Sequence, residues 1–379
     1  MRQTWRGWWL RCHLYLGLSV GFLLALLGLT GSLLVFYLDV DAVANPHTRV
    51  QVTTRHEIDP DRVLTNLRTA FPQRDGPWRI EMPLHSEDPI RARYGRPAER
   101  SFAVFAPLLV TMDPHSLQVT SQRFWGDSGT TWLYDLHYSL RAGVRGQMWV
   151  GFLGVALAVS LCSGLVLWWP SKRRIVQAIR PVVRAGRVKR VYDLHVLSGV
   201  YGSAVLLVLS ATGVALVWPQ ELRAMLSWVT RVQAPVSPQV FATPLEGAGI
   251  SLQQAVWVAR QNFPQAELRW LESSGGHGEV VSVRLFQPGE PGRRFPKTQI
   301  WLQPQTGDVI AVRDALNLPW SERLIHWMHP LHNGEALGVF GRVTALLAGL
   351  LLPVLWVTGL IRWRQKTQAQ AVAKRALLR

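Results

Sequence analysis

The sequence contains very little cysteine, and its cysteines do not suggest a disulfide framework. Cys12 and Cys162 are the only two among 379 residues. Both lie in or beside apolar segments, so we interpret them as small buried hydrophobic residues. The chain also lacks a C-x-x-C-H motif, which excludes a covalently attached c-type haem. It has no Walker loop, nucleophile elbow or H-E-x-x-H motif, so the sequence does not indicate the enzyme classes that use them.

Acidic residues are also scarce. The sequence has 24 Asp and Glu against 41 Lys and Arg, which gives a net charge of +17. Such an excess is common in nucleic-acid-binding proteins. Here, however, the basic residues cluster at the N-terminus, in residues 171–190 and at the C-terminus, always beside hydrophobic runs. The positive-inside rule accounts for all three clusters. We therefore expect membrane lipids with anionic head groups as partners of these segments, and no nucleic acid.

Long apolar stretches are abundant. Residues 14–38, 147–169, 196–218 and 339–361 each form a run of about the 20 residues that a bilayer crossing needs. Many of the 18 tryptophans lie near these runs, as in the aromatic belts of membrane proteins. The basic clusters place both termini and the 171–190 loop in the cytoplasm. We interpret the first run as a retained anchor and not as a signal peptide, because it matches the third run.

These runs predict a mostly α membrane protein, with four transmembrane helices from a tandem repeat and two external α+β domains. The predicted segments are the N-terminus with the first span (1–38), the first external domain (39–131), the second span (132–170), the basic loop (171–190), the third span (191–218), the second external domain (219–322), the fourth span (323–363) and the cytoplasmic tail (364–379).

Both external segments show the same order of predicted elements. Each contains a helix, from Pro60 to about Ala70 in the first segment, and from a Ser251 cap to about Asn262 in the second. Strands and turns follow. The predicted strands are residues 78–82, 102–112 and 117–120, then 279–285, 298–302 and 309–312. We therefore predict that the whole unit of span, external domain and span is duplicated.

The residues that survive the duplication are histidines near the ends of the spans. His13 and His195 are each followed by glycine at +4 and by Thr-Gly at +17 and +18. His137 and His332 share a tryptophan at −5 and glycines at +6, +9 and +27. The predicted topology places His13 and His195 near the inner face of the membrane. It places His137 and His332 near the outer face.

Two histidines that face each other across a helical bundle can supply both axial ligands of one haem iron. A single interfacial histidine is more often a snorkelling or hydrogen-bonding residue, but repetition at equal offsets favours ligation for the four together. Zinc is the rival metal, and a structural zinc site wants about four ligands, where each face supplies two clear histidines. We predict one haem between His13 and His195 and one between His137 and His332, each histidine in the first turns of a long helix. The repeated glycines are interpreted as room for the macrocycle.

Two further histidines precede His332. Because residues three apart lie on nearby faces of a helix, His329 is the alternative to His332 as a ligand. We favour His332, since it alone has a repeat partner, His137. For His326 and His329 two interpretations stay open. They line an external site for a metal-bearing substrate, or they make polar contacts between their helix and the external domain.

These residues resemble a known family. The matching features are His13-x3-Gly17 with Thr30-Gly31-Ser32, the pairs Leu136-His137 and Leu331-His332, and the segment LQPQTGDV at residues 302–309. They are similar to the PepSY-associated transmembrane proteins, whose strand–turn–strand motif reads D-P-x-T-G-x-V. Gln303 stands where aspartate is usual. The resemblance covers nearly the whole chain, and it implies that the two external domains are PepSY-like.

The resemblance also implies a function. The family includes inner-membrane ferrisiderophore reductases of the FoxB type. It therefore implies two non-covalent b-type haems, bound by His13, His195, His137 and His332, that carry electrons outward from an unknown donor. The implied substrate is a ferric siderophore, reduced in the periplasm of a bacterium with release of Fe²⁺. Two other hypotheses stay open: a non-catalytic membrane protein whose external domains bind peptides or regulate a partner, and a haem subunit that feeds another periplasmic enzyme.

Overall fold

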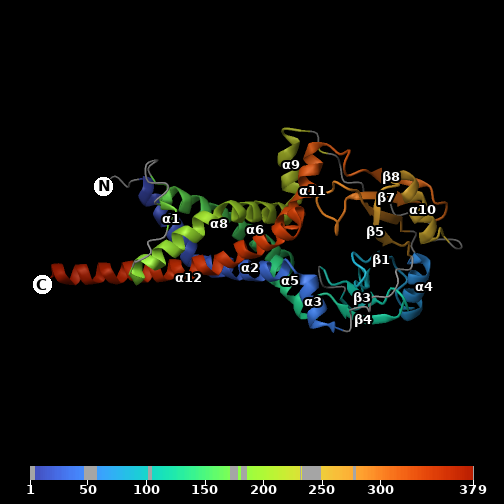
Figure 1. Cartoon of the computed structure of the whole chain (residues 1–379), viewed down its shortest axis with the longest axis horizontal. Coiled ribbons are helices and arrows are strands. Elements are labelled where there is room, and N and C mark those ends of the chain that lie inside the picture. Colours follow the sequence, from blue (N-terminus) through green and yellow to red (C-terminus); the bar gives the residue numbers. More distant parts are fainter. Residues whose placement is uncertain are drawn as a thin grey trace. The chain divides into compact units, whose positions relative to one another are not determined.

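The computed structural model describes residues 5–46, 58–100, 105–170, 178–180, 186–230, 232, 249–275 and 279–378. The chain divides into two compact units, and each takes residues from both halves of the sequence (Figure 1). We call them the helical unit (Met1–Phe36, Tyr134–Leu222 and Met328–Arg379) and the sheet unit (Tyr37–Leu133 and Arg223–Trp327). Most of the predicted loop 171–190 lies outside the described residues.

The helical unit contains the apolar helices. They are α1 (Trp5–Ser19), α2 (Gly21–Leu34), α6 (Gly143–Trp168), α8 (Arg187–Val217) and α12 (Gly338–Leu377). Among the described residues, three helices are long and apolar enough to cross a membrane, namely α6, α8 and α12. The bent pair α1 and α2 makes a fourth crossing if it counts as one span. This agrees with the predicted number of spans.

The first predicted span is not one continuous helix. α1 and α2 are separated at Val20 and are bent by 64°. Gly21 opens α2 beside the indole ring of Trp356, and a Cβ at Gly21 would lie 2.6 Å from the Cδ1 atom of that ring. Glycine and serine close together are a frequent cause of sharp helix kinks, and Ser19 and Gly21 flank this one. The predicted stretch 14–38 therefore corresponds to parts of two helices.

The sequence predicted His137 and His332 in the first turns of long helices, and this prediction is wrong. They lie in the last turns of two short helices, α5 (Gly129–Ser139) and α11 (Trp320–His332). Each short helix ends at a tight turn before the long helix that follows. Leu140 and Arg141 have φ of 49° and 55° after α5, and Gly334 has φ of 78° after α11. The turns reorient the chain, so α5 and α11 are separate from α6 and α12.

The sheet unit contains one antiparallel sheet of eight strands in the order β4-β3-β2-β1-β5-β6-β7-β8. The first half of the chain supplies β1 (Trp78–Glu81), β2 (Ile90–Tyr94), β3 (Leu108–Met112) and β4 (Val119–Phe124), and the second half supplies β5 (Glu267–Glu272), β6 (Val281–Phe286), β7 (Thr298–Leu302) and β8 (Val309–Arg313). β1 pairs with β5 at the centre. The two predicted external segments thus contribute to a single sheet.

One face of the sheet carries the core. The helices α4 (Pro60–Ala70) and α10 (Leu252–Asn262) pack their apolar side chains against it. Both helices begin as predicted: Asp59 caps α4, and Ser251 forms a capping box with Gln254. Successive strand residues point to opposite faces of the sheet. The side chains of the other face are largely charged or polar. The short helix α3 (Tyr37–Ala44) completes the unit, together with the end of α9 (Pro219–Ser227) and the first turns of α5 and α11.

The two predicted helices of the external segments and most predicted strands are confirmed, and two strands are additional. α4 and β7 have the predicted bounds. β2 (IRARY) and β5 (ELRWLE) were not predicted, because their charged residues conceal the apolar alternation. Their charged side chains point to the polar face of the sheet, where partners of opposite charge compensate them. The predicted strand 102–112 is shorter, and residues 101–104 lie outside the described residues.

Candidate functional site

The helical unit brings the four predicted histidines together as two pairs. His13 of α1 faces His195 of α8, with ring centroids 6.1 Å apart. His137 of α5 faces His332 of α11, with ring centroids 6.2 Å apart. A metal between two imidazole nitrogens, at about 2 Å from each, would separate the ring centres by roughly 6 Å. Both pairs therefore have the spacing that one shared metal ion requires.

Each histidine of the first pair is held through its Nδ1 atom by a neighbouring helix, α6 for His13 and α12 for His195. His13 Nδ1 lies 3.0 Å from the Ser160 carbonyl oxygen and 3.0 Å from the Ser163 hydroxyl. His195 Nδ1 lies 3.1 Å from the Leu355 carbonyl oxygen and 3.1 Å from the Thr358 hydroxyl. The two contact sets are equivalent, because Leu355 and Thr358 each follow their counterparts by 195 residues (355 − 160 and 358 − 163).

The second pair is held in the same way by the other two helices. His137 Nδ1 lies 3.1 Å from the Thr30 hydroxyl of α2. His332 Nδ1 lies 3.2 Å from the Thr212 hydroxyl of α8 and 2.9 Å from the Leu209 carbonyl oxygen. Thr30 and Thr212 are 182 residues apart, the same interval as His13 and His195. Every predicted histidine therefore rests on a hydroxyl group of a neighbouring helix.

The hydrogen bonds of these hydroxyls determine the tautomer of the rings. Each hydroxyl donates to a carbonyl oxygen of its own helix, for example Thr30 to Leu26 at 2.9 Å and Thr212 to Val208 at 2.7 Å. Ser163 and Thr358 do the same. Because the hydroxyl proton is already donated to that carbonyl oxygen, the hydroxyl oxygen acts as the acceptor towards the histidine. Nδ1–H of the histidine is therefore the donor. Nε2 is then the nitrogen with a free lone pair, which is the form that binds a metal.

Glycines let the rings approach the helices. A Cβ at Gly31 would lie 2.8 Å from Cε1 of His137, and one at Gly213 would lie 2.9 Å from Cε1 of His332. Gly164 and Gly359 stand in the same relation to His13 and His195, at 3.2 Å. The sequence interpretation assigned the repeated glycines to a macrocycle. The structure shows that the glycine after each hydroxyl residue makes room for an imidazole ring.

Sequence reasoning missed Ser163 and Thr358. Both stand at +26 from a predicted histidine, directly before the glycine noted at +27. A hydroxyl residue followed by glycine occurs at all four equivalent places: Thr30-Gly31, Ser163-Gly164, Thr212-Gly213 and Thr358-Gly359. That dipeptide was the available signal, since it faces one histidine each time.

A known protein family matches this sequence. The family model described as the PepSY-associated TM region matches residues 10–366, and this range contains all four histidines. The chain belongs to this family. Among curated proteins, no match was found. The membrane-crossing helices and the family membership together make this a membrane protein of the PepSY-associated family.

The two pairs of this PepSY-associated protein lie at different levels of the helical unit. His195 and Thr212 belong to the same helix, α8, and are 17 residues apart (212 − 195). At about 1.5 Å per residue this is roughly 25 Å along the helix, and Thr212 marks the level of His332. Within the described ranges, no group of three or more His, Cys, Asp or Glu is placed to hold a metal ion. A metal ion held by either pair would therefore have two histidine ligands from the described part of the chain.

His326 and His329 belong to neither pair. His326 is only 5% exposed, and its Nε2 lies 2.9 Å from a guanidinium nitrogen of Arg313. It therefore accepts a hydrogen bond within the sheet unit, which agrees with the polar-contact interpretation. His329 Nδ1 lies 3.5 Å from the amide nitrogen of Asn333. The ring that faces His137 is that of His332.

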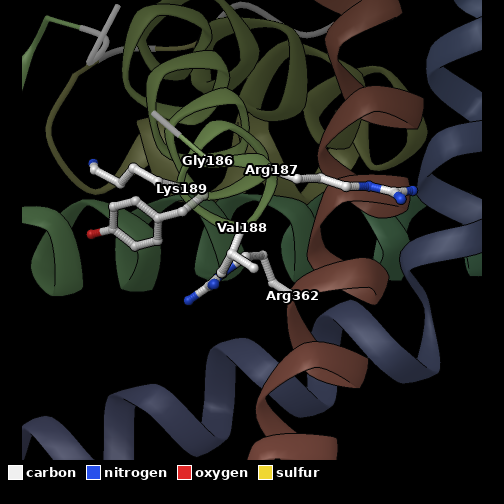
Figure 2. Close-up of a pocket in the computed structure, with 6 residues that line it drawn as sticks. Gly186, Arg187, Val188, Lys189 and Arg362 are labelled. Atoms are coloured by element: carbon white, nitrogen blue, oxygen red, sulfur yellow. The ribbon is translucent and has the colours of Figure 1, made fainter. Parts of the chain in front are cut away.

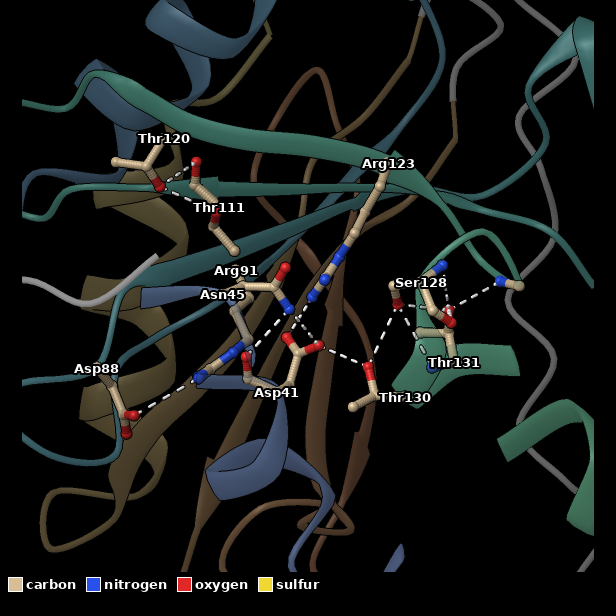
Figure 3. Close-up of polar contacts among 11 residues, drawn as sticks. Asp41, Asn45, Asp88, Arg91, Thr111, Thr120, Arg123, Ser128, Thr130 and Thr131 are labelled. Carbon is tan, nitrogen blue, oxygen red and sulfur yellow. Dashed lines mark hydrogen bonds and ion pairs between the residues drawn. The ribbon is translucent and has the colours of Figure 1, made fainter. Parts of the chain in front are cut away.

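Two polar clusters hold the first turns of the helices that carry His137 and His332. In the first, Asp41 of α3 accepts hydrogen bonds from Arg123 of β4 and from Thr130 of α5, the latter at 2.5 Å (Figure 3). Asn45 also donates to Asp41, at 3.1 Å. Thr131 continues the contacts to Ser128, at 2.8 Å between the hydroxyls.

In the second cluster the carboxylate belongs to the histidine-bearing helix itself. Arg223 of α9 binds Glu322 of α11, and Arg313 of β8 lies 2.9 Å from the same carboxylate. Arg223 follows Asp41 by 182 residues, and Arg313 follows Arg123 by 190 (313 − 123). Glu322 is 1% exposed. The charge is thus reversed between Asp41 and Arg223, whereas Arg123 and Arg313 carry the same charge.

A basic hollow lies at the N-terminal end of α8 in the helical unit. Figure 2 shows Arg187, Lys189 and Arg362 around it, beside the start of the helix at Gly186. Lys189 and Arg362 stack on the Tyr192 ring at 4.8 and 5.1 Å. Arg362 lies three residues after Gly359, the glycine beside the His195 ring. Lys189 also forms an ion pair with Asp193 of the same helix, so the positive charge of the hollow is partly neutralised.

Proposed function

We propose that this PepSY-associated protein is an inner-membrane oxidoreductase that binds two b-type haems and passes electrons to ferric siderophores in the periplasm. The observation that carries the proposal is the geometry of the histidine pairs: two imidazoles about 6 Å apart at their centres, each with Nδ1 occupied and Nε2 available. His13 and His195 would hold one haem, and His137 and His332 the other. Bound in this way, haem supplies one-electron transfer.

The chain's own residues would bind and orient these groups. Thr30, Ser163, Thr212 and Thr358 fix the rotation of the rings and make the imidazoles stronger ligands by accepting from Nδ1–H. The apolar helices around them keep water from the pairs. Equal contacts at equal offsets favour a tandem repeat as the origin of the two pairs.

Direction and substrate rest on topology and on the family resemblance. The positive-inside rule favours cytoplasmic termini, so the His13–His195 pair would lie at the inner side and the sheet unit in the periplasm. Electrons would enter at the inner pair from a donor of unknown identity and leave at the outer pair. One electron reduces Fe³⁺ in the siderophore to Fe²⁺, which the chelator holds less tightly, so the iron is released for uptake.

An absorption spectrum of the purified protein tests the haem assignment. We expect a Soret band that sharpens and shifts on reduction, with about two haems per chain. Single changes of His13, His195, His137 or His332 to alanine should each remove about one haem. His85→Ala is the control, because His85 lies exposed in the sheet unit. A colourless wild-type protein, or full haem content in all four variants, would refute the proposal.

A second experiment tests the acceptor. The anaerobically reduced protein is mixed with a ferric siderophore, and reoxidation is followed by stopped-flow absorbance. Rapid reoxidation with release of Fe²⁺ is expected. If the reduced protein is stable towards several ferric siderophores but is oxidised by a periplasmic redox protein, the alternative of a haem subunit for another enzyme is favoured.

A further inference from the structure

The polar face of the sheet gathers positive charge around Gln299. In the strand register Gln299 pairs with Arg284 on one side and with Arg313 on the other. Neighbouring strands lie about 4.8 Å apart, so the three side chains stand in one row on one face. Lys297 precedes Gln299 by two residues and belongs to the same face of the extended chain. Three cations thus surround one neutral amide.

Only one of these three cations has a carboxylate partner. Arg313 binds Glu322 at 2.9 Å. Arg284 stacks on the Trp270 ring at 5.1 Å, and its Nε is buried without a hydrogen-bond partner. Within the described ranges, no carboxylate forms an ion pair with Arg284 or Lys297. Glu290, the acid near Lys297, instead accepts from the backbone N–H groups of Gln287 and Lys297.

The crowding of charge affects the titration of the cluster. Burial, and then the charges of Arg284 and Arg313, lower the pKa of Lys297 to about 8. Burial, followed by the charge of Arg79, lowers the pKa of Arg284 to about 10, and the carboxylate of Glu272 acts in the opposite direction. A buried polar group without a partner and neighbouring like charges both cost stability. A bound anion would remove both costs at once.

We infer that Arg284 and Lys297, on the polar face of the sheet beside Gln299, form a binding site for a small oxyanion, either a carboxylate or a phosphate group. The guanidinium supplies planar N–H donors that match an oxyanion, and the ammonium supplies a second, adaptable charge. Gln299 supplies an amide, although its nitrogen already donates to Ser282 at 3.1 Å. The site belongs to the sheet unit, and it does not depend on haem binding.

Calorimetric titration of the purified full-length protein tests the site. Citrate and inorganic phosphate are the probes, each compared with sodium chloride at equal ionic strength. We expect at least one oxyanion to bind, and the two arms show which group is preferred. Arg284→Gln and Lys297→Gln should each weaken that binding by about tenfold or more. Arg323→Gln should change it by less than about twofold, since Arg323 carries the same charge at an exposed position of α11.

Thermal unfolding supplies a second readout for variants that fold. Without oxyanion, Lys297→Met should be at least as stable as the wild type, because it removes a repelled, half-buried charge. The better-binding oxyanion should raise the midpoint of the wild type and leave that of the Arg284→Gln/Lys297→Met double variant unchanged. Equal binding and equal midpoint shifts in the wild type and the double variant would overturn the assignment. So would a midpoint that rises with chloride alone.

Discussion

Each of the four paired histidines contacts two consecutive residues of a neighbouring helix, a hydroxyl residue and a glycine, and these have different roles. The hydroxyl accepts from Nδ1–H and so selects the tautomer, while the glycine removes the side chain that would push the ring away. A hydroxyl residue within an apolar helix would otherwise contribute little, since it already donates to its own backbone. The dipeptide therefore explains why a threonine or serine recurs at these places.

The hydroxyl of Thr30 gives the first prediction. Thr30→Val keeps the shape of the side chain but removes the acceptor 3.1 Å from His137 Nδ1. Outer-shell partners of this kind are typically worth about 10- to 100-fold in metal affinity. We expect the variant to lose haem from the outer pair at least about tenfold faster to a haem-scavenging protein. Thr344→Val is the control, because Thr344 is half-buried in α12 and donates to the Phe340 carbonyl of the same helix, at 2.8 Å. Equal loss rates in Thr30→Val and the control would contradict the assigned role.

A second prediction concerns the glycine beside it. Gly31→Ala places a methyl group 2.8 Å from Cε1 of His137, closer than van der Waals contact, so the ring must move. We expect the outer haem to be lost or its spectrum to change, while the inner pair stays intact. Gly129→Ala, in the helix that carries His137, serves as the control, because nothing lies within 4 Å of its Cβ position. If the two alanine variants have the same spectrum, the ring does not depend on Gly31.

The buried His326 gives a prediction about pH. Burial, followed by the charge of Arg313, lowers the pKa of His326 to about 3, whereas an unfolded histidine titrates near 6.5. Between these values the unfolded state binds more protons, so stability falls as the pH falls. At pH 5 the loss is about 2 kcal/mol relative to pH 7.5. His326→Gln retains an acceptor for Arg313. Between pH 7.5 and pH 5 this variant should lose about 2 kcal/mol less stability than the wild type, as measured by thermal unfolding at both pH values. His115→Gln, which changes an exposed histidine, should behave like the wild type.

Among the secondary-structure elements, the short helices α5 and α11 carry the His137–His332 pair, and a charged cluster holds the beginning of each. Glu322 gives the sharper test, since it is 1% exposed and takes both Arg223 and Arg313. Glu322→Gln leaves two guanidinium groups without a countercharge, which we expect to cost about 3 kcal/mol. Asp41→Asn should cost less, because Asp41 is more exposed than Glu322, at 14% against 1%. Denaturant unfolding compares the two, and an Asp41→Asn loss at least as large as that of Glu322→Gln would contradict this ranking.

The sequence identified elements where a periodic pattern was clean. α4 begins at a proline, and the apolar residues of β7 are followed by a turn, so both were predicted with their bounds. It failed for β2 and β5, because a strand with one charged face does not look apolar until its partners are known. It also failed at Leu140 and Arg141, where two ordinary residues adopt positive φ. Neither local pattern nor composition specifies such a turn, which is set by tertiary contacts.

For the candidate site, spacing alone identified which histidines pair, since equal offsets in two halves place them at equal levels. The same offsets contained the hydroxyl residues, and their role required coordinates that show Nδ1 facing them. The choice of His332 over His329 followed from the repeat, and the ring positions agree with it. What spacing could not indicate was the polarity exchange between Asp41 and Arg223, because equivalent positions there carry opposite charges.

At the scale of the whole molecule, each histidine pair combines the two halves of the chain. His13 comes from the first half and His195 from the second, and the same holds for His137 and His332. The sheet likewise joins four strands from each half through β1 and β5. Neither half could form a pair or the complete sheet alone, so we infer that the two halves fold as one protein.

The separation of the pairs gives the last prediction, which concerns electron flow through the whole protein. With the pairs roughly 25 Å apart along α8, His195→Ala should abolish the inner haem and leave the outer one, and His332→Ala should do the reverse. In lipid vesicles with a reductant enclosed at the side of the termini and a ferric siderophore outside, both variants should lose at least about nine-tenths of transmembrane turnover. The two should differ under anaerobic conditions without acceptor: His332→Ala still accumulates a reduced haem spectrum from the enclosed reductant, whereas His195→Ala does not. If either variant keeps wild-type turnover, the two pairs do not act in series, and electrons reach the substrate by another route.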